Sequence, residues 1–117
     1  MDRRALLGAA GERAAENELA RRGLRILERN ARTRFGEIDL VCRDGRGYVF
    51  VEVKTRRASS FVSAPEAVDR RKLARLERLA LGWLAARGDR SARWRIAVAA
   101  LTVDDDRMHV EMIEAGP

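Results

Sequence analysis

Apolar side chains recur along the chain with a helical period in two stretches. The first predicted helix runs from about Arg3 to Arg22 and stops at Gly23, a residue type that commonly ends helices. The second runs from Glu66 to Arg87 and stops at Gly88. One apolar stripe of this second helix is made of Leu73, Leu76, Ala80 and Trp83.

Five shorter runs predict strands, at Leu24 to Arg29, Gly36 to Arg43, Tyr48 to Thr55, Trp94 to Val103 and Met108 to Ile113. Asp44-Gly45-Arg46-Gly47 is a strong hairpin signal, and Asp104-Asp105-Asp106-Arg107 predicts a second hairpin. A basic loop is expected from Asn30 to Phe35 and a polar loop from Arg56 to Pro65. The order α-β-β-β-α-β-β predicts an α/β fold, with helices packed on a mixed sheet.

The length and composition favour one domain, residues 1–117, with a single packed core. No apolar run approaches the roughly 20 residues that span a bilayer. The N-terminus does not resemble a signal peptide, because charged residues directly follow its short apolar patch. The single cysteine, Cys42, cannot form an internal disulfide, so the cytoplasm is the expected compartment.

The formal net charge of +6 favours a polyanionic partner, although a basic surface also serves solubility alone. Of the 24 cationic residues, two are lysines, Lys54 and Lys72, and the other 22 are arginines. Where arginine is the default cation, a retained lysine indicates a need for a compact ammonium group.

The first hairpin places charged residues together. If Arg43 faces Tyr48 across the turn, facing residue numbers sum to 91 and the pairs that follow are Asp39 with Glu52 and Glu37 with Lys54. These four side chains then share one face, because side chains alternate along a strand. The other face is expected to be core, pairing Ile38 with Val53, Leu40 with Val51 and Cys42 with Val49.

Two carboxylates directly opposite on neighbouring strands repel each other, so we expect a cation between Asp39 and Glu52. Hard oxygen ligands suit Mg²⁺ or Mn²⁺, and the carbonyl of Val53 could add a ligand. Lys54 could orient or deprotonate an attacking water. The alternative is a surface hairpin, with Glu37 and Lys54 as an exposed salt bridge and two solvated acids.

The first helix carries two acids, Glu12 and Glu16, inside the arc of its apolar stripe. Acids in such positions are costly to bury unless they are paired. A catalytic pocket beneath the helix would explain them. The equal alternative is that they lie at the edge of the stripe and bond Arg32, Arg34 or Arg56.

Asp39 followed one strand later by Glu52-Val53-Lys54 resembles the D…ExK signature of restriction-endonuclease-like nucleases. A fuller set of positions is similar to the YraN family of bacterial endonuclease-like proteins, related to archaeal Holliday junction resolvases, over about Gly11 to Val103. The positions that carry this similarity are Gly11-Glu12, Ala15, Leu19, Gly23, Asn30-Ala31-Arg32, Gly36-Glu37-Ile38-Asp39-Leu40-Val41, Phe50-Val51-Glu52-Val53-Lys54-Thr55-Arg56, Ala67-Val68 and Lys72.

The resemblance implies a restriction-endonuclease-like core and Mg²⁺-dependent phosphodiester cleavage. It also implies a homodimer, with branched or duplex DNA as the partner. It implies that Asp39 and Glu52 are metal ligands and that Lys54 is the catalytic lysine. It favours Glu12 over Glu16 as the helix acid and places Lys72 near a phosphate. Two positions depart from the family pattern, Val62 and Arg95.

Three functions remain open from the sequence. The first is a nuclease in which phosphates of the DNA backbone meet Arg32, Arg34, Arg56, Arg57 and the second helix. The second is a non-catalytic nucleic-acid-binding or partner-recruiting module on the same fold, and the third is an RNA-directed relative.

The residues interpreted as structural are His109, Cys42, Trp83, Trp94 and the aspartates Asp104 to Asp106.

Overall fold

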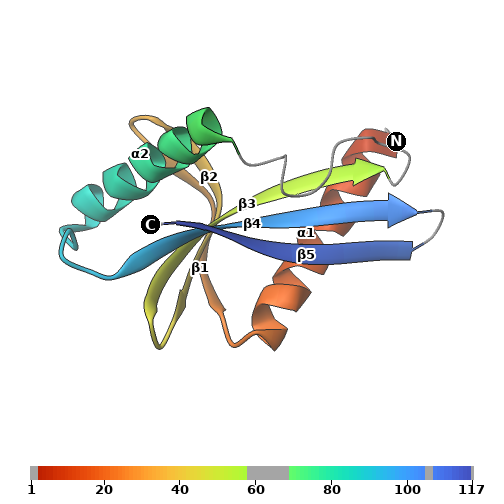
Figure 1. Cartoon of the computed structure of the whole chain (residues 1–117), viewed down its shortest axis with the longest axis horizontal. Helices are drawn as coiled ribbons and strands as arrows, with labels where there is room; N and C mark the ends of the chain where they lie inside the picture. Colours follow the sequence, from red (N-terminus) through yellow and green to blue (C-terminus); the bar gives the residue numbers. More distant parts are fainter. Residues whose placement is uncertain (1–2, 58–68, 105–106, 117) are drawn as a thin grey trace.

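The computed structural model describes residues 3–57, 69–104 and 107–116. Its elements follow the order expected from the sequence, and the mixed sheet is confirmed (Figure 1). In chain order they are α1 (Arg3–Arg21), β1 (Arg25–Thr33), β2 (Gly36–Asp44), β3 (Gly47–Arg57), α2 (Arg70–Arg87), β4 (Trp94–Asp104) and β5 (Arg107–Gly116). No helix in these ranges is long and apolar enough to cross a membrane.

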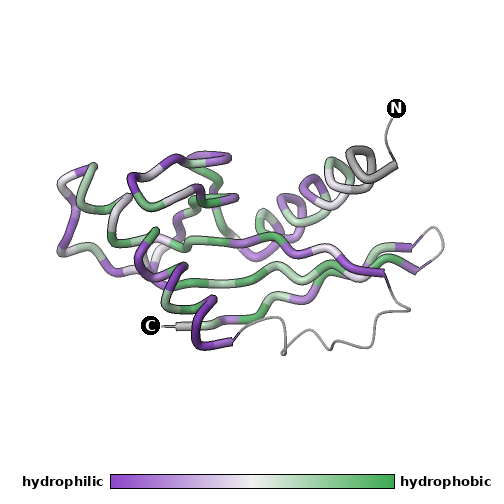
Figure 2. Tube along the Cα trace, turned by 90° about the horizontal axis from the view of Figure 1, so that it is seen from above, coloured by the Kyte–Doolittle hydropathy of each residue, from purple (hydrophilic) through white to green (hydrophobic). Residues whose placement is uncertain are grey.

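The five strands form one sheet in the order β1-β2-β3-β4-β5. Neighbouring strands are antiparallel except β3 and β4, which run parallel. A parallel pair needs a crossover connection, and α2 lies in the connection between these two strands. Figure 2 shows α1 and α2 on opposite sides of the sheet and toward opposite ends of it.

Each helix covers its own hydrophobic core. On the α2 side, Trp83 and Leu79 pack against Tyr48, Phe50 and Val98, with the Trp83 ring edge-on to both aromatic rings. On the α1 side, the buried residues include Ala15, Leu19, Cys42, Val49, Val51 and Leu101. Alternate residues of β3 therefore serve different cores, as the two-residue period of a strand requires.

Several predicted boundaries change; the last strand, for example, runs from Arg107 to Gly116 and not from Met108 to Ile113. The basic loop is wrong for residues 30–33, because Ala31, Arg32 and Thr33 pair with β2 and leave only a two-residue turn. The third strand continues to Arg57, because its last residues pair with β4, so the polar loop does not begin at Arg56. Helix α2 begins at Arg70, with Asp69 as its N-cap; the predicted start at Glu66 lies outside the described residues.

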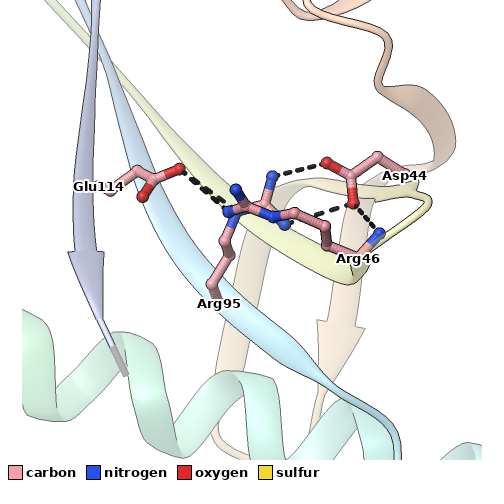
Figure 3. Close-up of polar contacts among 4 residues, drawn as sticks. All are labelled: Asp44, Arg46, Arg95 and Glu114. Atoms are coloured by element: carbon pink, nitrogen blue, oxygen red, sulfur yellow. Dashed lines mark hydrogen bonds and ion pairs between the residues drawn. The ribbon is translucent and has the colours of Figure 1, made fainter.

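A network of ionic side chains fastens the turn between β2 and β3 to the last two strands. The Asp44 carboxylate accepts hydrogen bonds from the backbone N–H of Arg46 at 2.8 Å and from Nη2 of Arg95 at 2.7 Å. Figure 3 shows Arg95 between Asp44 and Glu114, whose Oε1 lies 3.4 Å from Arg95 Nε. The Arg95 hydrogen bond is the main cause that lowers the pKa of Asp44. Arg95, a departure from the family pattern, thus has a local ionic partner.

Candidate functional site

The strands β2 and β3 separate at the acidic end of their hairpin. The predicted register is confirmed near the turn, where Arg43 pairs with Tyr48, but the pairing ends at Leu40 and Val51. The predicted facing pairs Asp39–Glu52 and Glu37–Lys54 are therefore wrong. Instead, the Asp39 carboxylate reaches across the gap and accepts a hydrogen bond from the Val53 N–H at 2.8 Å.

An irregularity in β1 accompanies this separation. The pairing of β1 with β2 includes Arg29–Leu40 and Ala31–Ile38 but omits Asn30 and Asp39 between them. Asn30 has a φ of 50°, in the left-handed region that an Asn tolerates better than most residues. A residue in that conformation interrupts the regular ladder, so Asp39 lies beside a local break in the sheet.

The side of the sheet that β2 residues face also changes at Asp39. Ile38 packs in the α2-side core, whereas Leu40 packs in the α1-side core. Strict alternation would put these two residues on one face, so the predicted pairing of Ile38 with Val53 in a common core is wrong. The change frees Asp39 from either core, and it is only partly buried.

Asp39 lines two small pockets, one toward each helix. The pocket toward α2 is also lined by Glu37, Glu52 and Leu76. The pocket toward α1 is also lined by Glu12, Glu16, Arg29, Asn30 and Val53. Acids from α1, β2 and β3 are thus gathered around one carboxylate, although they are far apart in the sequence.

Electrostatics at this position disfavours the ionised form of Asp39. Burial is the largest cause that raises the pKa of Asp39 above its ordinary value, and the charges of Glu52 and Glu37 raise it further. The hydrogen bond from Val53 and the charge of Arg75 act in the opposite direction. The like-charge proximity expected from the sequence is therefore present, although the direct strand pairing is not.

Two cations of α2 neutralise Glu52. Lys72 Nζ lies 3.0 Å from Oε2 of Glu52, and Arg75 Nη2 lies 2.8 Å from Oε1. Lys72 was expected near a phosphate, but here it binds a protein carboxylate. The sequence-based interpretation missed Arg75, although its position three residues after Lys72 puts both side chains on one side of the helix.

The two α1 acids differ in their surroundings. Glu16 is partly buried and forms an ion pair with Arg29, whose Nη2 lies 2.6 Å from Oε1. The expected partners Arg32, Arg34 and Arg56 are therefore wrong for Glu16. Glu12 is exposed and lines the same pocket as Asp39.

The predicted phosphate-binding cations lie in two separate places. Arg32 and Arg34 belong to the hairpin of β1 and β2, whereas Arg56 and Arg57 end β3 at the far end of the sheet (Figure 1). Lys54 is exposed on β3, two residues after Glu52, which places both on the same face of that strand. The site at Asp39 therefore lies between two basic ends.

A divalent cation at this site would take its ligands from the carboxylates around Asp39. Within the described ranges, no group of three or more His, Cys, Asp or Glu side chains is arranged to hold a metal ion. Mg²⁺, however, is commonly held by one or two carboxylates and keeps several waters. Asp39 and Glu52 line the same pocket and supply two carboxylates. To bind the cation, Glu52 would have to release its contacts with Lys72 and Arg75.

Three of the residues interpreted as structural lie in or against the hydrophobic cores, namely Cys42, Trp83 and Trp94. Cys42 is fully buried, and burial raises the pKa of its thiol to about 12. Trp83 belongs to the α2-side core, and Trp94 packs against it. His109 is exposed on β5. Asp105 and Asp106 lie outside the described residues.

Comparisons with known proteins place this chain among bacterial relatives. The model of "Uncharacterised protein family UPF0102" matches residues 11–101. A UPF0102 protein of Beutenbergia cavernae is 52% identical over 95 residues, which cover 81% of this chain and 80% of that protein. A UPF0102 protein of Kineococcus radiotolerans is 50% identical over 100 residues, which cover 85% and 82%.

Among solved structures, Pyrococcus furiosus SfsA in complex with Ca²⁺ is 17% identical with a TM-score of 0.43. The match covers 96% of this chain and 62% of that chain.

Proposed function

Because this chain belongs to the UPF0102 family, the YraN family of the sequence resemblance, and the match spans the Asp39 site, we propose that it is a metal-dependent endonuclease acting on DNA. Branched and duplex DNA are both candidate substrates. The observation that carries the proposal is the gathering of Glu37 and Glu52 around Asp39, a carboxylate whose pKa is raised mainly by burial and further by the charges of these two acids. Like charges held together at a cost to stability are typical of a functional site.

In this proposal Asp39 and Glu52 hold Mg²⁺ or Mn²⁺, with the Val53 carbonyl and Glu12 as the predicted further ligands. A bound metal ion of this kind activates water and neutralises charge developing on a phosphate. Glu37 lines the same pocket and adds negative potential that attracts the cation. The hydrogen bond from Val53 fixes one oxygen of Asp39, so the carboxylate is already oriented.

Lys54 is the residue proposed to act on the attacking water. Its ammonium group, on the same face of β3 as Glu52, can orient the attacking water and stabilise negative charge on the scissile phosphate. The arginines at the two basic ends, Arg32 with Arg34 and Arg56 with Arg57, would position the DNA backbone on either side of the site.

A second candidate function is a nucleic-acid-binding module without catalysis. The observation that favours it is the pair of contacts from Lys72 and Arg75, which already neutralise Glu52 without a metal ion. A carboxylate fixed in this way could serve only to anchor α2 to β3.

Incubation with linear, flapped and four-way DNA in Mn²⁺ separates the two functions. The nuclease proposal expects cleavage of at least one substrate, no product in EDTA, and a rate lower by about 100-fold or more in Lys54→Ala. The exposed Arg90, outside the site, provides the matched control Arg90→Ala with an unchanged rate. Binding without product, or equal products from wild type and Lys54→Ala, would reject the nuclease and leave the binding module.

A further inference from the structure

The outer side of α2 forms an open groove with the turn between β1 and β2. Phe35 and Leu81 are two large hydrophobic side chains that are exposed, by 49% and 53%. Both line the groove, which holds about 520 Å³ of space and is also bordered by Arg34, Arg78 and Ala74. This volume lies within the range of pockets that bind small organic groups.

The Phe35 ring is held in place. A Cβ added to Gly82 would lie 3.0 and 3.3 Å from two ring carbons of Phe35, so the missing side chain lets the ring lie close to α2. Thr33 fixes the turn, because its hydroxyl accepts the Phe35 N–H at 3.0 Å and donates to the Gly36 carbonyl at 2.9 Å. A positioned ring with half of its surface exposed can act as a stacking platform.

The charges around this ring favour a polyanion. The Arg34 guanidinium lies 5.2 Å from the centroid of the Phe35 ring. Along α2, Arg71, Arg75 and Arg78 are exposed at spacings of four and three residues, which align them on one face. This row leads from Glu52, which Arg75 contacts, to the groove, which Arg78 lines. The groove contains one acid, Glu77.

We propose that this groove binds an unpaired base of DNA, stacked on Phe35, with the neighbouring phosphates on Arg34 and Arg78. Aromatic rings beside a basic track are the usual means of binding single-stranded nucleic acid. Figure 1 shows the turn of β1 and β2 beside α2, which brings this groove near the strands that carry Asp39 and Glu52. The choice of DNA as the polymer rests on the proposed function. The inference adds that DNA with unpaired nucleotides is the preferred substrate.

Binding measured in EDTA tests the groove separately from cleavage. The probes are a fluorescent duplex and the same duplex with a single-stranded flap that contains 2-aminopurine. Wild type is expected to bind the flapped DNA more tightly and to quench the 2-aminopurine. Phe35→Ala should weaken flap binding by about tenfold and leave duplex binding unchanged, whereas Phe35→Trp should retain both the affinity and the quenching.

Arg78→Gln provides a second variant, because it is exposed and glutamine keeps the helix propensity. It should weaken flap binding and reduce the dependence of flap affinity on salt concentration by the amount expected for about one phosphate contact.

An unchanged flap affinity in Phe35→Ala overturns the proposal. So does a wild-type dimer that Phe35→Ala converts to a monomer, since the groove would then join two copies of the chain. If cleavage fails but these effects hold, the groove stands and the nuclease does not.

Discussion

Asp39 lies at the position where β2 and β3 separate, opposite an asparagine in the left-handed conformation. Its carboxylate is partly buried and close enough to Glu37 and Glu52 for their charges to disfavour its ionisation. A carboxylate placed for stability alone would have mainly cationic neighbours, whereas the charges of two acids oppose the ionisation of Asp39 and the charge of one cation, Arg75, favours it. At the scale of the single residue, this conflict is the reason for proposing Asp39 as a functional group.

The variant Asp39→Asn should stabilise the metal-free protein at neutral pH by about 0.5–2 kcal/mol. The asparagine can still accept the Val53 N–H bond through its carbonyl, but it removes the repulsion from Glu37 and Glu52. Urea denaturation at pH 7 measures this change.

The pH dependence gives the control. A raised pKa in the folded state means that Asp39 keeps its proton where the unfolded chain has released it. Its contribution to stability is therefore fully present below the ordinary aspartate pKa and is lost as the pH rises through the folded value. The advantage of Asp39→Asn should disappear at low pH; an advantage that is constant with pH, or absent at pH 7, contradicts this interpretation.

At the scale of elements, α2 brings the cations of Lys72 and Arg75 to Glu52. These ammonium and guanidinium groups would compete with the proposed metal ion for the same oxygens. Lys72→Gln should therefore bind Mn²⁺ more tightly, by about threefold to tenfold, the size expected for a charged hydrogen-bonded pair that is partly exposed. Calorimetric titration measures the affinity.

Arg71→Gln is the matched control for Lys72, since Arg71 is exposed on the same helical turn. It should leave the Mn²⁺ affinity unchanged. Weaker Mn²⁺ binding in Lys72→Gln than in this control would show that Lys72 supports the metal site and does not compete with it.

The hairpin turn between β2 and β3 offers a paired test of backbone geometry. Gly47 has a φ of 124°, and a Cβ there would clash with the Arg93 carbonyl oxygen, which accepts the Tyr48 N–H. Gly47→Ala should cost about 2 kcal/mol or more in the free energy of unfolding. Gly45→Ala meets no atom within 4 Å and should change stability by less than about 0.5 kcal/mol. Similar values for the two variants would contradict this conformation of the turn.

The hairpin also shows how far the sequence predicts the site. The Asp44-Gly45-Arg46-Gly47 turn determines the register near it, so the pairing of Arg43 with Tyr48 follows from local chemistry. The same rule fails four residues away, because beyond Leu40 each strand follows its other neighbour, β1 or β4. A local pattern does not contain that information.

Contacts between distant elements were missed for the same reason. The ion pairs of Glu52 with Arg75 and of Glu16 with Arg29 join residues 23 and 13 positions apart. Gly82 gives no sign in the sequence that the Phe35 ring will lie against it. Helical spacing predicts which side chains share a face, but the tertiary fold decides what that face meets.

At the scale of the whole molecule, the acids around Asp39 lie within a chain of net charge +6. The two helices cover opposite faces and opposite ends of the sheet, and Asp39 lines a pocket toward each of them (Figure 2). A local negative site on a basic protein favours a cation at one point and a polyanion around it. This arrangement of charge matches the substrate and cofactor of the proposed nuclease.

Mn²⁺ binding at equilibrium, without DNA, tests the central claim most directly. Titration of wild type, Asp39→Asn and Glu52→Gln, followed by the electron paramagnetic resonance of free Mn²⁺, gives affinity and stoichiometry. We predict one Mn²⁺ per wild-type chain and at least about a tenfold loss of affinity in either variant, since even the loss of an outer partner of a ligand costs that much. Equal affinities in all three proteins would contradict the metal site at Asp39 and Glu52.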